Sequence, residues 1–441
     1  MPLHPVLEEK LNAALTPGAP TSFTRRDARL PQVLGKAHAV IGMRRAGKTT
    51  FLRQLLANRR AKLPPERSLY ISFDDDRLAG IGVDQLAFLL EEFYRRFPAL
   101  RSRHDVLWLL DEVQLVPSWE RFIRRVMESE RAEFVVSGSS ARMLSREVHT
   151  SLRGRGMETV IRPFSFREFL RHRGEEPAKP VREWVPAERS LVEKRFREFL
   201  TEGGFPEVQG LDKALRLDLL QGYVDLVLFR DVIERHELTQ VAALRWLVRH
   251  CLRNPGGSFS VHRLTDDLRS QGHGVARDAV NAMLSHLMDA FLLSAVPLAT
   301  ESERKRNSNP RKIYPADPGL VHAFDASGRA NLGHALETAV MNELERQRAD
   351  VGYFKSMDGL EVDFLVRHRN GDEELIQVCA NLRSPETLAR ELRALEASVH
   401  EHPRARRRLL VLDRDAAGEL EAPGVEVIPA YQWLLAAPAE H

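Results

Sequence analysis

An octapeptide that follows a short apolar run restricts the fold of this chain more than any other feature of the sequence. Residues 42–49 read Gly-Met-Arg-Arg-Ala-Gly-Lys-Thr and match the pattern G-x-x-x-x-G-K-[ST] at every fixed position. Apolar residues 37–41 precede the octapeptide, and an amphipathic helical pattern follows it. A strand, a glycine-rich loop and a helix in this order predict a phosphate-binding loop in a parallel α/β sheet.

The chemistry of this loop gives each position a role. Its glycines let backbone N–H groups point at phosphate oxygens, and the helix that begins near Lys48 adds its positive dipole end. We expect Lys48 to reach the β- and γ-phosphates and Thr49 to offer its hydroxyl to Mg²⁺, so the predicted cofactors are ATP and Mg²⁺. For Arg44 and Arg45, contact with phosphate or a neighbouring subunit and a solvated or ion-paired position are both open. The predicted nucleotide-binding residues are Gly42, Arg44, Arg45, Ala46, Gly47, Lys48, Thr49 and Thr50.

Two carboxylates end a second apolar run. Residues 106–110 are apolar and are followed by Asp111 and Glu112, about 60 residues after the loop, which is a usual spacing in this class. We predict that Asp111 joins Thr49 in the Mg²⁺ shell and that Glu112 polarises the attacking water. Lys48 and Glu112 are therefore predicted catalytic residues, and the carboxylate pair favours hydrolysis over nucleotide binding alone.

Polar residues after a third apolar run complete the predicted catalytic set. Residues 134–137 are followed, after one glycine, by Ser139 and Ser140, and ligands lie at the carboxyl ends of parallel strands. Ser139 or Ser140 is expected to hydrogen-bond the γ-phosphate or the water; the alternative is an ordinary turn. Arg155, or else Arg153, is expected to neutralise charge in the site of a neighbouring subunit; the alternative is a surface arginine paired with carboxylates.

Length and composition bound the remaining possibilities. The 441 residues exceed what one hydrophobic core usually serves, so about two to four domains are expected. No apolar run approaches the roughly 18–20 residues that span a bilayer, and the first ten residues show no secretory signal. Cys251 and Cys379 are the only cysteines and suggest neither a metal cluster nor a disulfide framework, so we expect a cytoplasmic protein without a membrane partner. The net charge of +3 is small for this length and does not by itself demand a nucleic-acid partner.

A longer series of motifs resembles those of a known family. GMRRAGKTT, LYISFDDDR, LLDEVQ, VVSGSSARML, SLRGRG and PFSFREFL occur in this order, and GGFPEV, YPADPGLVHAF and GLEVDFLV continue the series. In these motifs the chain resembles a group of bacterial and archaeal AAA-like P-loop ATPases with a C-terminal restriction-endonuclease-like domain. The resemblance implies an α/β fold with an AAA-like ATPase core, a helical lid, a winged-helix domain and an α/β terminal domain of the PD-(D/E)xK type. It also implies that Ser139 is at the sensor position and that Arg155 is the arginine finger.

The changes of pattern along the chain place the boundaries of these parts. Residues 1–30 are expected to be irregular because proline and glycine cluster at positions 17–20. The expected domains are the N-terminal lead-in (1–30), the ATPase core (31–175), the helical lid (176–245), the winged helix (246–322) and the PD-(D/E)xK-like domain (323–441).

A basic loop lies in the expected winged helix, between strands near residues 291–297 and 312–314. Helices at residues 261–270 and 276–290 would form its helix-turn-helix. On a flexible hairpin tip, basic side chains would suit DNA phosphates; a solvated charge run in a protein–protein module is the alternative. The predicted DNA-binding residues are Arg304, Lys305, Arg306, Arg311 and Lys312.

The expected nuclease-like domain has altered residues. Asp363 and Glu337 match its acidic positions, but Gln377 and Cys379 stand where the family-like pattern has Glu and Lys. An amide is a poor Mg²⁺ ligand beside a carboxylate, and a neutral thiol does not replace an ammonium group. We therefore expect no nuclease metal site and a fold that is kept as a DNA-binding or assembly platform.

These features together predict a DNA-associated ATPase that assembles into a homo-oligomeric ring such as a hexamer. Hydrolysis of Mg·ATP would be coupled to DNA binding or remodelling, on branched or single-stranded DNA among other forms. A nucleotide-controlled protein–protein switch in signalling or defence is the alternative, and an ATP-dependent nuclease is a third hypothesis.

Overall fold

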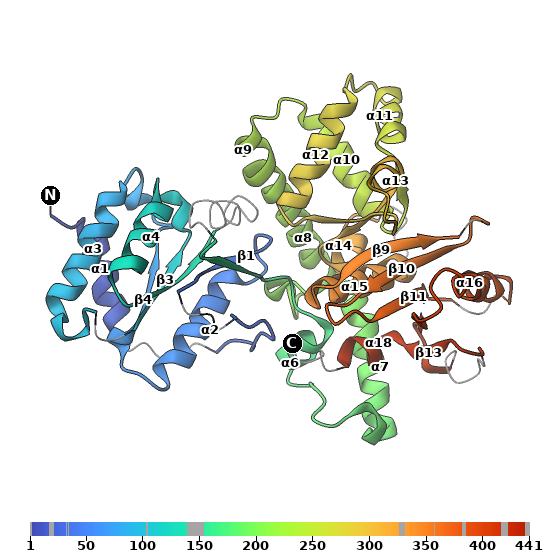
Figure 1. The fold of residues 1–441 in the computed structure, drawn as a ribbon, viewed down its shortest axis with the longest axis horizontal. Helices are drawn as coiled ribbons and strands as arrows, with labels where there is room; N and C mark the ends of the chain where they lie inside the picture. Colours follow the sequence, from blue (N-terminus) through green and yellow to red (C-terminus); the bar gives the residue numbers. More distant parts are fainter. Residues whose placement is uncertain are drawn as a thin grey trace. The chain divides into compact units, whose positions relative to one another are not determined.

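The computed structural model of the chain describes residues 2–16, 22–31, 33, 35–102, 105–138, 154–325, 331–356, 358–381, 385–415 and 422–436 (Figure 1). The chain divides into two compact units, Met1–Arg162 and Pro163–His441. Among the helices within these ranges, none is both long enough and apolar enough to cross a membrane.

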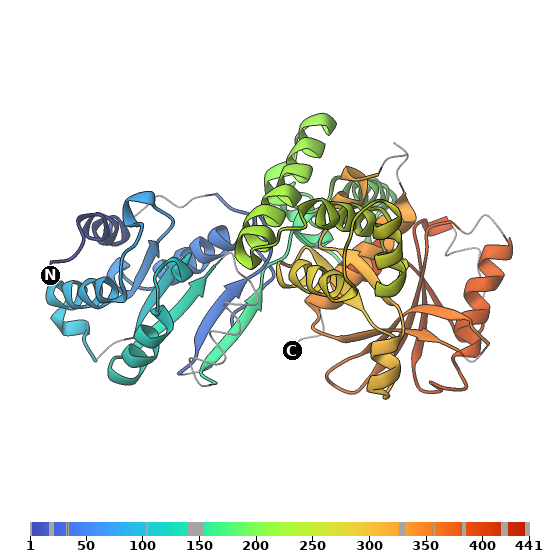
Figure 2. The ribbon, with the colours of Figure 1, turned by 90° about the horizontal axis from the view of Figure 1, so that it is seen from above.

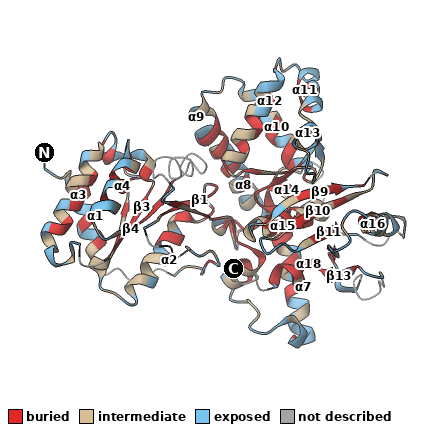
Figure 3. Cartoon of the chain, viewed as in Figure 1, coloured by how far each residue is buried: buried red, intermediate tan, exposed pale blue. Residues whose placement is uncertain are grey.

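The first unit is built on a five-stranded sheet in the order β2-β3-β4-β1-β5, in which every neighbouring pair is parallel. Its strands are β1 (Ala37–Ile41), β2 (Ser68–Ser72), β3 (Val106–Asp111), β4 (Ala132–Ser137) and β5 (Gly156–Val160). Every residue of β1 and β3 is buried, as in strands covered on both faces (Figure 3). The prediction of a parallel α/β core is confirmed.

Helices follow the strands of this sheet in the alternating order that a parallel sheet requires. They are α2 (Lys48–Arg60), α3 (Val83–Arg96) and α4 (Trp119–Ser129), together with the short 3₁₀ turns η1 (Pro65–Arg67), η2 (Asp76–Leu78), η3 (Pro98–Leu100) and η4 (Val113–Leu115). The lead-in that was expected to be irregular contains a helix, α1 (Pro5–Leu15), so that expectation is wrong for these residues. Helix α1 has Pro5 in its first turn, where the missing N–H costs nothing, and it buries Val6, Leu7 and Leu11 at helical spacing.

The second unit begins with helices and continues with two sheets. Its first helical segments are α6 (Phe166–His172), η5 (Val181–Glu183), α7 (Pro186–Glu202), η6 (Pro206–Val208), α8 (Lys213–Val227), the π-helical η7 (Leu228–Ile233), α9 (Glu234–His236) and α10 (Val241–Arg253). A three-stranded antiparallel sheet follows in the order β6-β8-β7. This sheet and its helices consist of β6 (Ser258–Phe259), α11 (Val261–Ser270), α12 (Arg277–Asp289), β7 (Leu293–Val296), α13 (Glu303–Ser308) and β8 (Arg311–Pro315).

A mixed five-stranded sheet in the order β13-β12-β11-β10-β9 forms the C-terminal part of this unit. Figure 2 draws this part in orange to red. Its strands and helices are α14 (Pro318–Ala323), α15 (Leu332–Arg346), β9 (Asp350–Lys355), β10 (Glu361–Arg367), β11 (Glu373–Cys379), α16 (Pro385–Ala397), β12 (Arg406–Val411), β13 (Glu426–Pro429) and α18 (Ala430–Leu435). One apolar core joins helices α6 and α7 to this sheet through side chains such as Phe166, Phe196, Phe364 and Tyr431. The helices after residue 163 and the C-terminal sheet therefore share a core.

The basic loop differs from the flexible hairpin tip that the sequence suggests. Residues Glu303–Ser308 form the short helix α13, whose first turn is capped by the Ser302 hydroxyl. Lys312 lies on β8 and is buried, so it does not belong to an exposed basic surface.

Candidate nucleotide-binding site

The phosphate-binding loop lies between β1 and α2, as the motif predicts. Gly42 has φ +143°, and a Cβ atom built on it would lie 2.0 Å from the carbonyl oxygen of Ile161. Ile161 in turn donates its N–H to the carbonyl of Ile41 at 2.7 Å. Glycine is therefore required at position 42, because the chain after β5 lies against the loop backbone.

Lys48 begins α2 and is buried beside the loop. Its Nζ donates to the carbonyl oxygens of Gly42 at 2.9 Å and Met43 at 3.1 Å. Gly47, in the left-handed region, is the N-cap residue of α2, and the N–H groups of the first helical turn, which have no partner within a helix, begin here. Of the other predicted loop residues, Ala46 is buried, Arg44 and Thr49 are half-buried, and Arg45 and Thr50 are exposed.

Asp111 lies at the carboxyl end of β3 and accepts hydrogen bonds from three hydroxyl groups. The Thr49 hydroxyl donates to Oδ2 at 2.9 Å, which brings together the two residues predicted to hold Mg²⁺. The Tyr70 hydroxyl donates to the same oxygen at 2.7 Å, and the Ser137 hydroxyl donates to Oδ1. Burial, and then the negative charge of Asp111, raise the pKa of Tyr70. Three hydroxyl groups thus donate to the two oxygens of Asp111.

Tyr70 and Ser137 were not among the predicted site residues. Tyr70 is on β2 and Ser137 ends β4, the two strands that flank β3. The pairing of Leu110 with Val136 puts Ser137 directly beside Asp111. This position depends on the strand order, so the sequence signal was only that each residue lies near the end of an apolar run.

Glu112 follows Asp111 in an unusual backbone conformation. Its φ is +55°, and it is the N-cap residue of η4. Its N–H donates to the Ser137 hydroxyl at 3.4 Å, and its Oε2 accepts a hydrogen bond from Gln114 Nε2 at 2.5 Å. The left-handed backbone turns the carboxylate away from the course of β3, and Gln114, a residue that we did not predict, restrains it.

Of the remaining predicted catalytic residues, Arg155 lies within the described part of the chain and the others do not. Ser139, its alternative Ser140, and Arg153 lie outside the described residues. Arg155 precedes β5, is exposed, and places Nη1 3.0 Å from Glu128 Oε1 on α4. Its role in a neighbouring subunit stays a prediction.

A buried arginine from the N-terminal segment also contacts the loop. Arg26 is 7% exposed, its Nη1 donates to the carbonyl of Ala46 at 2.9 Å, and its N–H donates to Gln54 Oε1 on α2 at 2.9 Å. No local pattern in the sequence predicts this contact, because Arg26 lies in a segment that was expected to be irregular.

A second cluster of carboxylates lies in the second unit, around Lys312. Nζ of Lys312 is 2.8 Å from Glu361 Oε1, 2.9 Å from Asp363 Oδ1 and 3.9 Å from Glu337 Oε1. The Tyr314 hydroxyl donates to Glu337 Oε1 at 2.5 Å. Burial is the largest influence on Lys312 and lowers its pKa, but the carboxylates outweigh it and the net pKa is raised. Lys312 is thus unavailable to a DNA phosphate, contrary to prediction.

The two altered positions of the expected nuclease-like domain lie beside Asp363. Gln377 Oε1 accepts from the Asp363 N–H at 3.1 Å, and Gln377 Nε2 donates to Glu391. The buried Cys379 thiol lies 3.5 Å from the carbonyl of Asn381, and burial raises its pKa. Within the described ranges, no group of three or more His, Cys, Asp and Glu residues has a geometry that could hold a metal ion.

Of the other predicted DNA-binding residues, Arg304, Lys305 and Arg306 lie on α13, and Arg311 begins β8. Arg304, Lys305 and Arg311 are exposed, whereas Arg306 is half-buried and has Nη1 3.8 Å from Glu303 Oε1.

The parallel sheet, the loop at the end of β1 and the hydroxyl-lined Asp111 define a P-loop protein with an ATPase-like core of the AAA type. The chain matches the AAA domain family over residues 35–170. It also matches two domains of unknown function, DUF8612 over residues 193–331 and DUF4143 over residues 332–433.

Relatives extend over almost the whole chain. An uncharacterized protein, MJ1544, of Methanocaldococcus jannaschii is 30% identical over 421 residues, which cover 93% of this chain and 90% of the relative. A protein of Haemophilus influenzae is 26% identical over 399 residues, covering 90% of this chain and 93% of that protein. The chain belongs to the family of AAA-domain proteins that includes MJ1544.

Solved structures resemble parts of the chain more distantly. The Walker-type ATPase PABY2304 of Pyrococcus abyssi is 16% identical, with a TM-score of 0.42 over 66% of this chain and 91% of that one. The Aeropyrum pernix ORC1 protein, solved in complex with DNA, is 18% identical, with a TM-score of 0.27 over 66% of this chain and 86% of that one.

Proposed function

We propose that this protein binds Mg·ATP at the loop of residues 42–49 and hydrolyses it. The observation that carries the proposal is the contact between the Thr49 hydroxyl and the Asp111 carboxylate, 2.9 Å apart at the ends of α2 and β3. Both residues offer oxygen ligands, which Mg²⁺ prefers, and Thr49 lies in the first turn of α2, where the helix N-terminus suits phosphate. When bound, Mg·ATP supplies the phosphoryl group to be transferred to water.

Several side chains would have separate roles in this reaction. Lys48 exchanges the carbonyls of Gly42 and Met43 for phosphate oxygens and neutralises their charge. Glu112 orients the attacking water and accepts its proton, while Gln114 holds the carboxylate in position. Tyr70 and Ser137 orient the Asp111 carboxylate through their hydrogen bonds.

Assembly would complete the site. Arg155, which lies on the surface beside Glu128, is the proposed finger that reaches a neighbouring copy in a ring such as a hexamer. Ser139 is the proposed sensor.

We further propose that the ATPase is DNA-associated through the part of the chain from 246 to 322, read as a winged helix. Helices α11 and α12, followed by the antiparallel strands β7 and β8, have the order expected of that module. The exposed cations Arg304, Lys305 and Arg311 support phosphate contacts, with Arg306 beside them. The domains proposed around it keep the boundaries 31–175, 176–245 and 323–441, and the last is a nuclease-like platform rather than a nuclease.

The test is the ATP turnover rate in the presence of single-stranded, duplex and branched DNA, with particle size measured alongside. We expect at least one DNA form to stimulate turnover, and the variant R304E/K305E/R311E to lose that stimulation and keep its basal rate. The matched control R404E/R406E reverses exposed arginines elsewhere in the second unit and should keep the stimulation. Turnover that ignores every DNA form, with no DNA retained at low salt, would contradict DNA association.

A nucleotide-controlled protein switch is the second candidate. The loss of Lys312 from the predicted basic surface and the ion pair of Arg306 favour it, because they leave fewer cations for DNA. A partner that co-purifies only with ATP, together with DNA-independent turnover, would support this alternative. An ATP-dependent nuclease would instead require Mg²⁺-dependent cleavage that Asp363→Ala abolishes.

A further inference from the structure

Arg26 ties the phosphate-binding loop to the end of the first unit. One of its guanidinium nitrogens donates to the carbonyl of Ala46 inside the loop, and the other terminal nitrogen donates to the carbonyl of Arg162. The segment that carries Arg26 is fixed to α2 by the bond from its N–H to Gln54. A planar guanidinium group that donates to two carbonyl oxygens fixes their relative positions more rigidly than an ammonium group does.

Arg162 is the last residue of the first unit, and the residues on either side of it are anchored as well. Ile161 lies against Gly42 of the loop, as the 2.0 Å approach to a built Cβ shows. In the second unit, the Pro163 carbonyl accepts from Arg346 Nη2 at 2.6 Å, and the Phe164 N–H donates to the Gly204 carbonyl at 2.6 Å. Four consecutive residues thus connect the loop to an anchor in the second unit.

Gly204, which accepts the hydrogen bond from the Phe164 N–H, is itself held by several contacts. A Cβ on Gly204 would lie 2.2 Å from the Phe164 carbonyl oxygen, so only glycine allows this approach. The Gly204 N–H donates to the buried Asp317 carboxylate at 2.6 Å, and burial raises the pKa of Asp317 to about 7.

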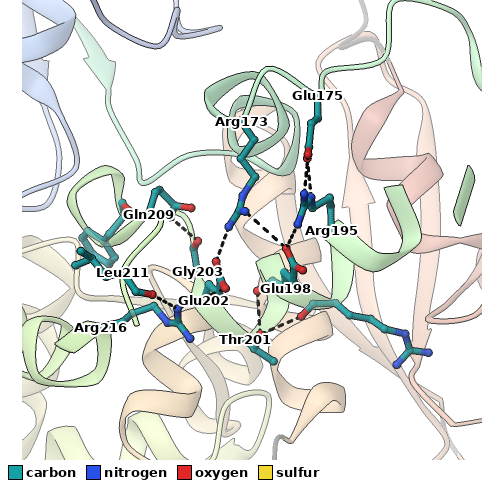
Figure 4. Close-up of polar contacts among 12 residues, drawn as sticks. Arg173, Glu175, Arg195, Glu198, Thr201, Glu202, Gly203, Gln209, Leu211 and Arg216 are labelled. Carbon is teal, nitrogen blue, oxygen red and sulfur yellow. Dashed lines mark hydrogen bonds and ion pairs between the residues drawn. The ribbon is translucent and has the colours of Figure 1, made fainter. Parts of the chain in front are cut away.

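A polar network fixes the chain just before Gly204 (Figure 4). Gln209 Nε2 donates to the Gly203 carbonyl at 3.0 Å, and Arg173 Nη2 is 2.7 Å from Glu202 Oε2. Arg195 joins the same network through Glu175 and Glu198. Because Gly204 follows the end of α7 and its neighbours are held by this network, a displacement of Phe164 would have to move the end of α7 as well.

We propose that Arg26 is a positioning residue of the nucleotide site and that it passes the state of the loop to the second unit through residues 161–164. The proposal rests on the function proposed above. For Lys48 to meet a phosphate, it must leave the carbonyls of Gly42 and Met43, and the peptide groups of the loop then readjust. Arg26 holds one of those peptide groups, at Ala46, and conveys its shift to Arg162.

The test is amide hydrogen exchange of the whole chain with and without Mg²⁺ and ATPγS, a slowly hydrolysed ATP analogue. In the wild-type protein we expect nucleotide to slow exchange in peptides that cover residues 42–50, 158–166 and 200–206. In Arg26→Met, at saturating nucleotide, the protection at 42–50 remains and that at 200–206 is lost; affinity falls about tenfold, as expected when one charged hydrogen-bonding group is removed. Arg25→Met, at an exposed neighbouring arginine, should behave as the wild type.

Two further variants keep the test decisive. Arg26→Lys keeps the charge and a donor, so it should recover affinity to within about threefold of wild type even if the methionine variant folds poorly. Gly204→Ala disturbs only the far end and should bind nucleotide normally but lose protection at 200–206. Protection at 200–206 that survives in Arg26→Met, or that is absent in a wild-type protein that binds ATPγS, overturns the inference and leaves the ATPase proposal standing. A wild-type protein that binds no nucleotide overturns both.

Discussion

Within the described ranges, Asp111 in the first unit and the carboxylates around Lys312 in the second unit are completed by different partners. Asp111 in the first unit accepts hydrogen bonds from the hydroxyls of Thr49, Tyr70 and Ser137. Asp363 in the second unit lies 2.9 Å from the ammonium group of Lys312, which also contacts Glu361. The first cluster receives neutral donors, and the second receives a cation from its own chain.

This difference explains why one cluster suits Mg²⁺ and the other does not. Hydroxyl groups orient a carboxylate without cancelling its charge, so the charge of Asp111 remains available to a metal. An ammonium group among Asp363, Glu361 and Glu337 occupies the position and the charge that a metal would need. Lys312 is thus an internal cation that joins β8 to β10 and α15.

The largest expected effect comes from removing that cation. Lys312→Met leaves Asp363 and Glu361 without their cation, so the free energy of unfolding should fall by about 3–5 kcal/mol. Denaturant unfolding without nucleotide measures it, with Lys305→Met on the exposed α13 as the matched control. Added Mn²⁺ should restore part of the stability of Lys312→Met and leave that of the wild type unchanged. Equal stability of Lys312→Met and Lys305→Met would contradict the role of Lys312 as an internal cation.

Removing the charge of Glu112 should have the next largest effect. Glu112→Gln keeps the loop and Asp111 intact, so ATP binding should persist while turnover falls by about 100-fold or more. Phosphate release and nucleotide affinity, measured on the same preparation, separate the two steps. Turnover close to wild type would show that another residue orients the water.

Removing one donor from Asp111 should have a smaller effect. Tyr70→Phe deletes a single hydroxyl, worth about 1 kcal/mol, so the Mg²⁺ concentration that supports half-maximal turnover should rise about fivefold. Tyr94→Phe is the matched control, because the Tyr94 hydroxyl is buried and has no hydrogen-bond partner in the described part of the chain. Indistinguishable Mg²⁺ dependence in the two variants would argue against a role for Tyr70.

The last expected effect is a pH dependence of stability that arises in the second unit, at Glu337 and Asp317. Burial, more than any neighbouring charge, raises the pKa of Glu337 from 4.5 to about 8, so between these values the folded protein holds a proton that the unfolded chain releases. Stability should therefore fall as pH rises through this window, with a slope below the about 1.4 kcal/mol per pH unit of one full proton. Glu337→Gln should flatten the slope without abolishing it, since burial also raises the pKa of Asp317, to about 7. An unchanged slope in unfolding experiments from pH 5 to 8 would exclude Glu337 as its source.

The parts of the fold that depend on local sequence patterns could be predicted from the sequence. Strands β1 to β4 are apolar runs, and the motifs at the ends of two of them are enough to predict that Lys48, Thr49 and Asp111 meet at one site. Strand β5 was missed because Gly156–Val160 mixes apolar and polar residues and is only partly buried. Helix α1 was missed because the prolines and glycine after it dominated the pattern.

The parts that could not be predicted depend on which elements are neighbours. Nothing local separates Lys312 from Arg304 or Arg311 in the basic run; the pairing of β8 with its sheet and the closeness of β10 decide that Lys312 is buried. The contacts of Tyr70 and Ser137 with Asp111 likewise follow from the strand order, and that of Arg26 from the path of the N-terminal segment over the loop.

The measurement that tests the central claim most directly is calorimetric titration of the protein with ATP in the presence and absence of Mg²⁺. We expect saturable binding of one ATP per chain that Mg²⁺ strengthens, no binding by Lys48→Ala, and binding that no longer responds to Mg²⁺ in Asp111→Asn. Failure of the wild-type protein to bind ATP with Mg²⁺ present, or equal binding by Lys48→Ala, would contradict a nucleotide site at residues 42–49.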